Sequence, residues 1–332
     1  MAGPLPFDLL PDTAEVGTDG GTSIGGCDLV DLADEFGTPL FVYDEAHLRA
    51  RCREAVAAFG EGVAYAGKAF LCGAMARLVV EEGMYLDVAT GGELYMARHA
   101  GVPADRLILH GNNKSELELE MAIEEGVGLI VVDSFDELDR LDALNAAIGA
   151  VPRVLLRVTP GVEAHTHEYV ATGQDDSKFG FTVSTGLAAA AVERALTSGT
   201  VDLVGVHAHI GSQVFEVDSF GRALEVLAGF AAPYDLAELS VGGGLGVAYV
   251  EGESAPSITQ WGEVVRSACE VAGVTARVSA EPGRAIAALA AVTLYRVGTI
   301  KDLEGIRTYV AVDGGMSDNP RPVLYGSGYE TF

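Results

Sequence analysis

One lysine, Lys68, stands at the end of a short apolar segment, and its amine is the first group of the chain with evident chemistry. The segment, residues 64–70, reads AYAGKAF. A lone lysine after a strand is more often a surface residue, but the apolar neighbours Tyr65 and Phe70 predict a buried amine here. Burial disfavours the charged form of lysine. A desolvated amine can attack a carbonyl and hold an aldehyde cofactor as a Schiff base.

Acidic and imidazole groups end other apolar segments. Glu281 begins an EPGR sequence that ends at Arg284. A carboxylate that faces a pyridine nitrogen keeps it protonated, which makes the ring the stronger electron sink that loss of CO2 requires. A structural pair between Glu281 and Arg284 is the alternative. The imidazole of His209 could stack on a cofactor ring, although a lone histidine is more often structural.

A glycine loop, GGGLG at residues 242–246, follows a further apolar segment. Glycines let backbone N–H groups approach a phosphate closely, and barrels often bind phosphate after their seventh and eighth strands. A simple turn is the alternative. Ser212 could add a hydroxyl donor to the same phosphate. Near the end of the chain, Arg321 offers a planar fork for a carboxylate, and Tyr325 offers a hydroxyl.

The elements that must position these groups alternate between apolar segments and amphipathic stretches. Eight strand–helix units in a row predict an α/β fold with a closed (β/α)8 TIM-type barrel, and an open doubly wound sheet is the alternative. In such a barrel, active-site residues gather at the carboxyl ends of the strands. The predicted strands span residues 63–67, 85–88, 107–110, 129–132, 154–158, 203–207, 237–241 and 276–279. The polar residues at their ends include Lys68, Asp87, His110, Asp133, Arg157, His207, His209 and Glu281.

Helix signals separate the predicted strands. Ser115 and Ser134 each precede a glutamate by three residues, which is typical of a capping box. Gly149 stands where the second helix should end. The residues predicted to share one face of the first helix are Leu117, Met121 and Ala122.

Three regions follow from this pattern. Residues 41–285 are predicted to form the barrel. Residues 1–40 and 286–332 lie outside it, and we expect a partial second β-domain built from both chain ends. Residues 291–297 and 308–312 are its predicted strands.

Composition excludes several classes of partner. Lys and Arg number 21 against 48 Asp and Glu, a net charge of −27, which argues against nucleic acid and anionic membranes. The four cysteines form no CxxC pair, so we expect neither a metal site nor a disulfide framework. Residues 1–10 lack a secretory signal, and the longest apolar run, residues 285–295, is too short to span a bilayer. These features predict a cytoplasmic protein.

Taken together, these motifs resemble those of the fold-type III, alanine racemase-like, pyridoxal phosphate-dependent decarboxylases. The resemblance is greatest to the diaminopimelate decarboxylases and covers nearly the whole chain. It rests on YAGKA at 65–69, DVATGGEL at 87–94, SKFG at 177–180, HIGSQ at 209–213, GGGLG at 242–246, EPGR at 281–284, RP at 321–322 and LYG at 324–326.

The resemblance implies a role for each motif. Lys68 would form the Schiff base with pyridoxal 5'-phosphate, His209 would stack on the ring, and Glu281 would pair with the ring nitrogen. The residues implied to bind the cofactor are Lys68, Asp87, His209, Ser212, Gly242, Gly243, Gly244, Glu281, Gly283 and Arg284. Those implied to bind the distal end of the substrate are Arg284, Arg321 and Tyr325.

The implied reaction is that of a carboxy-lyase, which converts meso-2,6-diaminoheptanedioate to L-lysine and CO2 as the last step of lysine biosynthesis. The resemblance also implies a homodimer and a further C-terminal segment that carries a catalytic cysteine and a tyrosine. None of the four cysteines has that context, so we expect this chain to bind the cofactor weakly. The alternatives are a decarboxylase of ornithine, arginine, lysine or carboxynorspermidine, an inactive fragment or regulatory homologue, and a nucleotide-binding α/β protein.

Overall fold

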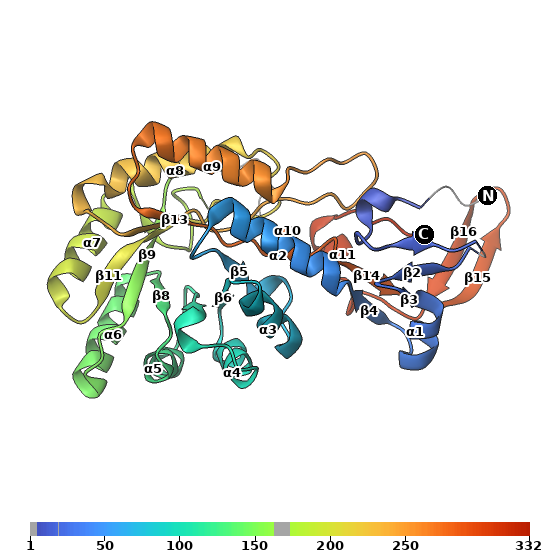
Figure 1. Ribbon diagram of the computed structural model, residues 1–332, viewed down its shortest axis with the longest axis horizontal. Coiled ribbons are helices and arrows are strands. Elements are labelled where there is room, and N and C mark those ends of the chain that lie inside the picture. The colour runs from blue at the N-terminus through green and yellow to red at the C-terminus, as the bar shows by residue number, and fades with distance from the viewer. Residues whose placement is uncertain (1–4, 19, 163–172) are drawn as a thin grey trace. The chain divides into compact units, whose positions relative to one another are not determined.

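Eight short parallel strands form one sheet in the computed structural model, which describes residues 5–18, 20–162 and 173–332 (Figure 1). Two backbone hydrogen bonds join the first strand to the chain directly after the last. Ala64 N donates to Ala280 O at 2.9 Å, and Ala66 N donates to Pro282 O at 3.1 Å. These bonds close the sheet, so the predicted barrel is confirmed and the open sheet is wrong. The strands are β5 (Ala64–Ala66), β6 (Tyr85–Val88), β7 (Leu107–Leu109), β8 (Leu129–Val132), β9 (Arg153–Thr159), β11 (Asp202–His207), β12 (Glu238–Ser240) and β13 (Arg277–Ser279).

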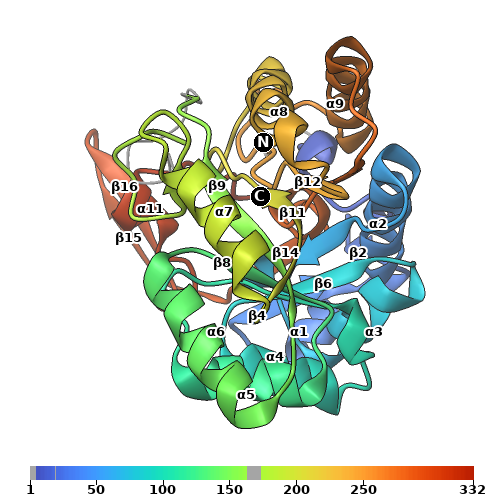
Figure 2. The same cartoon turned by 90° about the vertical axis from the view of Figure 1, so that its left-hand side faces the viewer.

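Helices follow the barrel strands along the chain and lie outside them (Figures 1 and 2). The sequence did not indicate one further strand, β10 (Phe181–Thr182), which pairs in parallel with β9. The helices are α3 (Gly73–Glu81), α4 (Gly91–His99), α5 (Glu116–Glu125), α6 (Phe135–Ile148), α7 (Leu187–Ser198), α8 (Asp218–Ala231) and α9 (Ile258–Ala272), with the short α10 (Arg284–Ala287) after the last strand.

The helix caps agree with the sequence in part. Ser115 and Glu118 form the predicted capping box at the start of α5. Ser134 accepts from Glu137 N at the start of α6, and Gly149 ends that helix in a left-handed conformation. The second box is not formed, because the Glu137 carboxylate accepts from Asp133 N at 3.0 Å instead of from Ser134 N.

Two-residue alternation explains why polar groups gather at one end of the barrel. A buried apolar cluster takes residues from several strands, among them Ile108, Leu155 and the partly buried Tyr85. Because side chains two residues apart point to the same face of a strand, the next inward positions toward the carboxyl ends are polar. Those next positions are Asp87, His110 and Arg157.

The chain divides into two compact units. The barrel unit comprises residues 51–246 and 256–286, and the second unit comprises residues 1–50, 247–255 and 287–332. Helix α2 (Glu45–Phe59) crosses the boundary between the units along the chain. No helix among the described residues is both long enough and apolar enough to cross a membrane.

The second unit contains small antiparallel sheets. β1, β2 and β3 form one of them, β14 pairs with β4, and β15 pairs with β16. The strand predicted over residues 291–297 is divided between β14 and β15, and the one over 308–312 lies within β16. The elements are β1 (Glu15–Val16), β2 (Thr22–Ile24), β3 (Cys27–Asp28), α1 (Leu29–Phe36), β4 (Leu40–Tyr43), β14 (Ala291–Leu294), β15 (Val297–Leu303), β16 (Arg307–Val312) and α11 (Arg321–Tyr325).

Candidate functional site

Lys68 lies in a 3₁₀ turn, Gly67–Ala69, directly after β5 at the carboxyl ends of the strands. Its side chain is exposed, so the predicted burial is wrong. The reason is that β5 ends at Ala66 and the chain then turns, so Lys68 lies beyond the buried residues Ala64 to Gly67. The positive charge of Lys68 acts to lower the pKa of Asp87, which burial raises, and that of His209, which burial lowers, so the amine lies near these two groups.

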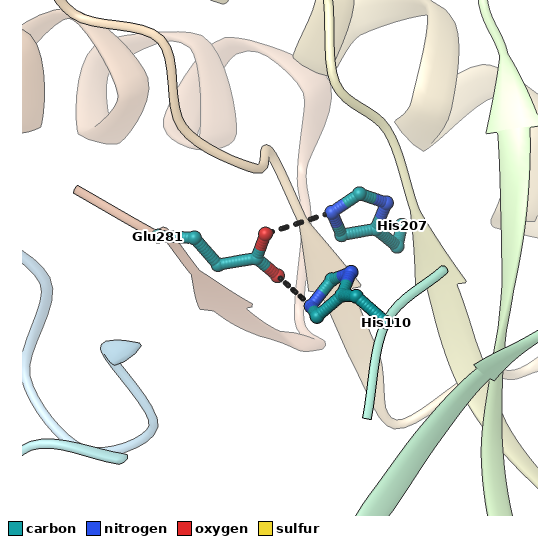
Figure 3. A group of neighbouring side chains, drawn as sticks. All are labelled: His110, His207 and Glu281. Carbon is teal, nitrogen blue, oxygen red and sulfur yellow. Dashed lines mark hydrogen bonds and ion pairs between the residues drawn. The ribbon is translucent and has the colours of Figure 1, made fainter. Parts of the chain in front are cut away.

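Glu281 is the centre of this polar end (Figure 3). Its carboxylate is buried and accepts from His207 Nε2 at 2.9 Å and from Ser240 Oγ at 3.0 Å. His110 Nε2 lies 3.6 Å from the second oxygen, Oε1, and 3.7 Å from Asp87 Oδ1. The first two contacts come from β11 and β12, and His110 directly follows β7. The carboxylate is therefore surrounded from three strands.

The two neighbouring carboxyl groups differ in their affinity for a proton. Burial, together with the charge of Glu281, raises the pKa of Asp87 well above its ordinary value. Burial alone would also raise the pKa of Glu281, but the adjacent His207 and His110 outweigh it and hold that pKa below its ordinary value. Burial lowers the pKa of His110 to about 3, against the opposing charge of Glu281. Near neutral pH, the site therefore holds an ionised Glu281 beside an uncharged His110.

The glycine loop packs directly on the strand ends. Gly242 has a φ of +66°, and a Cβ there would meet Ala208 O and His209. A Cβ on Gly243 would meet Glu281 O. Gly244 has a φ of +117° and is equally close to the backbone of residue 211. Glycine is therefore required at each position by close approach of the backbone. Gly242 N donates to Ser240 Oγ at 3.2 Å, which ties the loop to the end of β12.

His209 lies against this loop. Gly243 N donates to His209 Nδ1 at 3.2 Å, which fixes the ring beside the loop. Burial, and next the charge of Lys68, lower the pKa of His209 well below its ordinary value. An uncharged, half-buried imidazole with one nitrogen engaged is suited to stacking on a flat ring.

Ser212 and Arg284 meet on the same side of the barrel. Arg284 Nη2 donates to Ser212 Oγ at 3.1 Å. Gly283 packs against Ala66, where a Cβ would approach the Ala66 Cβ to 3.0 Å. The turn that contains Gly283 and Arg284 is thus set against β5, the strand that leads to Lys68.

Residues that the sequence left without a role complete the site. His110, Asp133, Arg157 and His207 each stand at a predicted strand end, and that position was their only signal. Arg157 Nη1 lies 3.7 Å from Asp133 Oδ1, and its guanidinium lies 4.2 Å from the ring of Phe179. Their positions at strand ends therefore indicated that these residues lie at the rim of the barrel. Which residues they contact could be seen only in the folded structure.

Lys114 is buried next to the site without any signal in the sequence. Its ammonium donates to Gly111 O at 2.7 Å, Val131 O at 2.6 Å and Glu137 Oε1 at 2.7 Å. All three ammonium hydrogens are thereby used. Burial lowers the pKa of Lys114, and Glu137 opposes this shift. Lys114 joins the loop after β7 to β8 and to the start of α6.

Arg321 and Tyr325 lie in α11 of the second unit. The guanidinium of Arg321 lies 5.1 Å from the centre of the Tyr325 ring. The two side chains therefore lie against one another. Their predicted role in binding substrate stays a prediction.

His110, His207 and Glu281 are close enough to one another to hold a metal ion. Metal-bound histidines usually donate their other ring N–H to an acceptor that fixes the tautomer. His207 Nδ1 has no hydrogen-bond partner among the described residues. Its Nε2 must also carry the hydrogen that it donates to the ionised Glu281, so it cannot ligate a metal in that form.

The same residues fit pyridoxal phosphate. Asp87 Oδ1 and His110 Nε2 are buried polar atoms with no hydrogen-bond partner in the described part of the chain. They lie beside an ionised carboxylate that could accept from a ring N–H. The glycine loop offers backbone donors to a phosphate, and the exposed Lys68 amine is free of the barrel wall.

Comparison with known proteins first defines the class. A family model described as "Pyridoxal-dependent decarboxylase, pyridoxal binding domain" matches residues 45–288. A lysine/ornithine decarboxylase from Vibrio vulnificus shares the fold, with a TM-score of 0.78 at 23% identity. The match, the closed barrel and the lysine at its rim together identify a pyridoxal-dependent decarboxylase of the fold-type III class.

More similar relatives then define the family. The diaminopimelate decarboxylase of Mycobacterium tuberculosis strain H37Rv is 49% identical over 328 residues, which cover 92% of this chain and 73% of that protein. The Bacillus subtilis diaminopimelate decarboxylase is 45% identical over 338 residues, which cover 97% of this chain and 77% of that protein. The diaminopimelate decarboxylase from M. jannaschii, solved in complex with L-lysine, has a TM-score of 0.89 and 31% identity, with 96% and 77% covered. The chain therefore belongs to the diaminopimelate decarboxylase family.

Proposed function

We propose that this protein decarboxylates meso-2,6-diaminoheptanedioate to L-lysine and CO2 with pyridoxal 5'-phosphate as its cofactor. The observation that carries the proposal is the combination at one end of the barrel: an exposed lysine amine, a buried ionised carboxylate and a glycine loop. Family membership supports the same reaction, and the M. jannaschii relative was solved with L-lysine, which is the product in this proposal.

The cofactor supplies an electron sink for the electron pair that remains when CO2 leaves. Lys68 is the chain's nucleophile toward the cofactor aldehyde. Glu281, whose pKa is lowered chiefly by the adjacent His207, would keep a hydrogen on the ring nitrogen. His209 would pack on the ring face. Asp87, with its raised pKa, is the group that most readily retains a proton beside Glu281.

Backbone N–H groups and a hydroxyl would bind the phosphate of the cofactor. Gly244 would contribute its N–H group, and Ser212 would contribute its hydroxyl. The N–H groups of Gly242 and Gly243 donate to Ser240 Oγ and His209 Nδ1, so they would have to be shared with the phosphate or turned toward it. Arg284 already bonds to Ser212 and adds a positive charge. We also propose that the protein is a cytoplasmic homodimer. The barrel and the second unit would be the two domains of each subunit.

Lysine formation tests the proposal. The protein is incubated with meso-2,6-diaminoheptanedioate and added pyridoxal phosphate, beside Lys68→Ala and the control Lys301→Ala, which alters an exposed lysine on β15. We expect lysine from the unaltered protein and the control, but none from Lys68→Ala. Removing the nucleophile should also abolish the covalent, borohydride-trapped cofactor.

Two results would contradict the proposal. Equal lysine formation by Lys68→Ala would remove Lys68 from the reaction. Release of CO2 from ornithine, arginine or lysine, with none from meso-2,6-diaminoheptanedioate, would assign the chain to another basic amino acid decarboxylase.

A further inference from the structure

The carboxylate of Glu281 is held by donors that belong to the barrel wall. His207 ends β11, and its side chain is 2% exposed. Ser240 ends β12 and is fully buried. An ionised carboxylate can only accept hydrogen bonds, so both residues must donate to it. Since His207 Nδ1 has no partner among the described residues, the bond to Glu281 is the only hydrogen bond that this ring makes there.

We propose that His207 and Ser240 are positioning residues that fix the carboxylate of Glu281 toward the cofactor ring nitrogen. This inference rests on the proposed function. A carboxylate has about four lone-pair sites, and the two fixed donors occupy one on each oxygen. The remaining sites stay available for a ring N–H, and the side chain does not have to be ordered when the cofactor binds.

The barrel contains a matched contact that serves as a control. In the register of β12 and β13, Glu238 stands opposite Arg277, and Ser240 stands opposite Ser279. Ser240 donates to Glu281, and Ser279 Oγ donates in turn to Glu238 Oε1 at 3.0 Å. Glu238 is buried, and it also accepts from Arg277. It lies at the amino ends of the strands, away from Lys68.

The inference is tested by measuring how the protein, after removal of any bound cofactor, binds two probes. One is pyridoxal phosphate, and the other is its analogue with carbon in place of the ring nitrogen. We expect the unaltered protein to prefer pyridoxal phosphate. His207→Leu should weaken binding of pyridoxal phosphate about tenfold to hundredfold, the range for a bond to a charged group, and change binding of the analogue much less. His207→Gln retains an N–H donor and should recover most of the preference.

Ser279→Ala is the control variant. It breaks the Glu238 contact and should lower the unfolding midpoint while leaving the preference between the two probes unchanged. If His207→Leu does not fold, Ser240→Ala removes a single oxygen atom and is judged by the same preference. The absorption spectrum of the bound cofactor gives a second readout, because it depends on protonation of the ring.

The outcomes separate this inference from the function on which it rests. Equal weakening of both probes by His207→Leu and Ser240→Ala would show a purely structural role and overturn the inference alone. An unaltered protein with no preference for the ring nitrogen would overturn the inference together with the role proposed for Glu281. Lysine formation that depends on Lys68 would still stand in both cases.

Discussion

At the scale of single residues, the carboxylate of Glu281 organises the rim of the barrel, because His207 and Ser240 both donate hydrogen bonds to it. Asp87, His209 and Glu281 come together at one rim of the barrel, as their positions at strand ends indicated. The exposure of Lys68 differs from the prediction, because apolar neighbours in sequence say nothing about where the chain leaves the wall. Lys114 had no signal at all, since its three acceptors belong to segments that only the fold brings together.

The depressed pKa of His110 makes the apoprotein sensitive to acid. The folded state favours the uncharged ring, so this group's contribution to stability is complete above its ordinary pKa of 6.5 and is lost as pH falls toward about 3. Between pH 6.5 and 3, the unfolding free energy should fall by up to about 1.4 kcal/mol per pH unit on this account. His110→Gln should remove this part of the slope.

Urea unfolding of the apoprotein at several pH values within that window measures the effect. His99→Gln is the control, because His99 is exposed on α4 and burial is the cause of the shift at His110. A slope that His110→Gln leaves unaltered would show that the ring titrates normally in the folded protein.

At the scale of elements, the strands were predictable and the helix faces were less so. All eight barrel strands overlap the predicted segments, with ends that differ by at most one residue, because strands buried on both faces read as continuous apolar runs. In α5, by contrast, Leu117 is 72% exposed, whereas Leu119 and Ala122 are buried. Of the predicted face, Ala122 is buried but Leu117 is not, because apolar residues occur on both sides of this helix and its packing partners decide which side is covered.

Truncation of the two leucines tests that assignment. Leu119→Ala should lower the unfolding free energy by about 2–5 kcal/mol, as for a buried leucine. Leu117→Ala should change it by no more than about 0.5 kcal/mol. Chemical denaturation of both variants measures the difference, and equal losses would mean that Leu117 is covered in solution.

At the scale of the whole molecule, charge is the dominant property. The net charge of −27 makes the folded chain repel itself, and salt screens that repulsion. The pattern of charge indicated which partners to exclude, but the sequence contained no signal for the bonds that close the barrel. Closure depends on contacts between Ala64 and Ala280, which only the complete ring of strands brings together.

Salt should therefore raise the midpoint of thermal unfolding. We expect a rise of a few degrees between about 0.1 M and 1 M sodium chloride at neutral pH, where the screening length falls from about 10 Å to 3 Å. The rise should shrink near pH 5, where part of the carboxylates take up protons. A midpoint that salt lowers at neutral pH would show that attractive ion pairs outweigh the net repulsion.

The contact between the glycine loop and Glu281 restricts how this site can evolve. Glu281 N donates to Gly242 O at 2.7 Å, and Gly243 lies against Glu281 O. In the proposed binding mode, one continuous patch of backbone thus positions both the loop that faces the phosphate and the residue whose carboxylate faces the ring nitrogen of the cofactor. A substitution selected for a change at the phosphate will displace the group that tunes the ring. Variants in the loop should accordingly be epistatic with variants at Glu281, and the two properties should change together rather than one at a time.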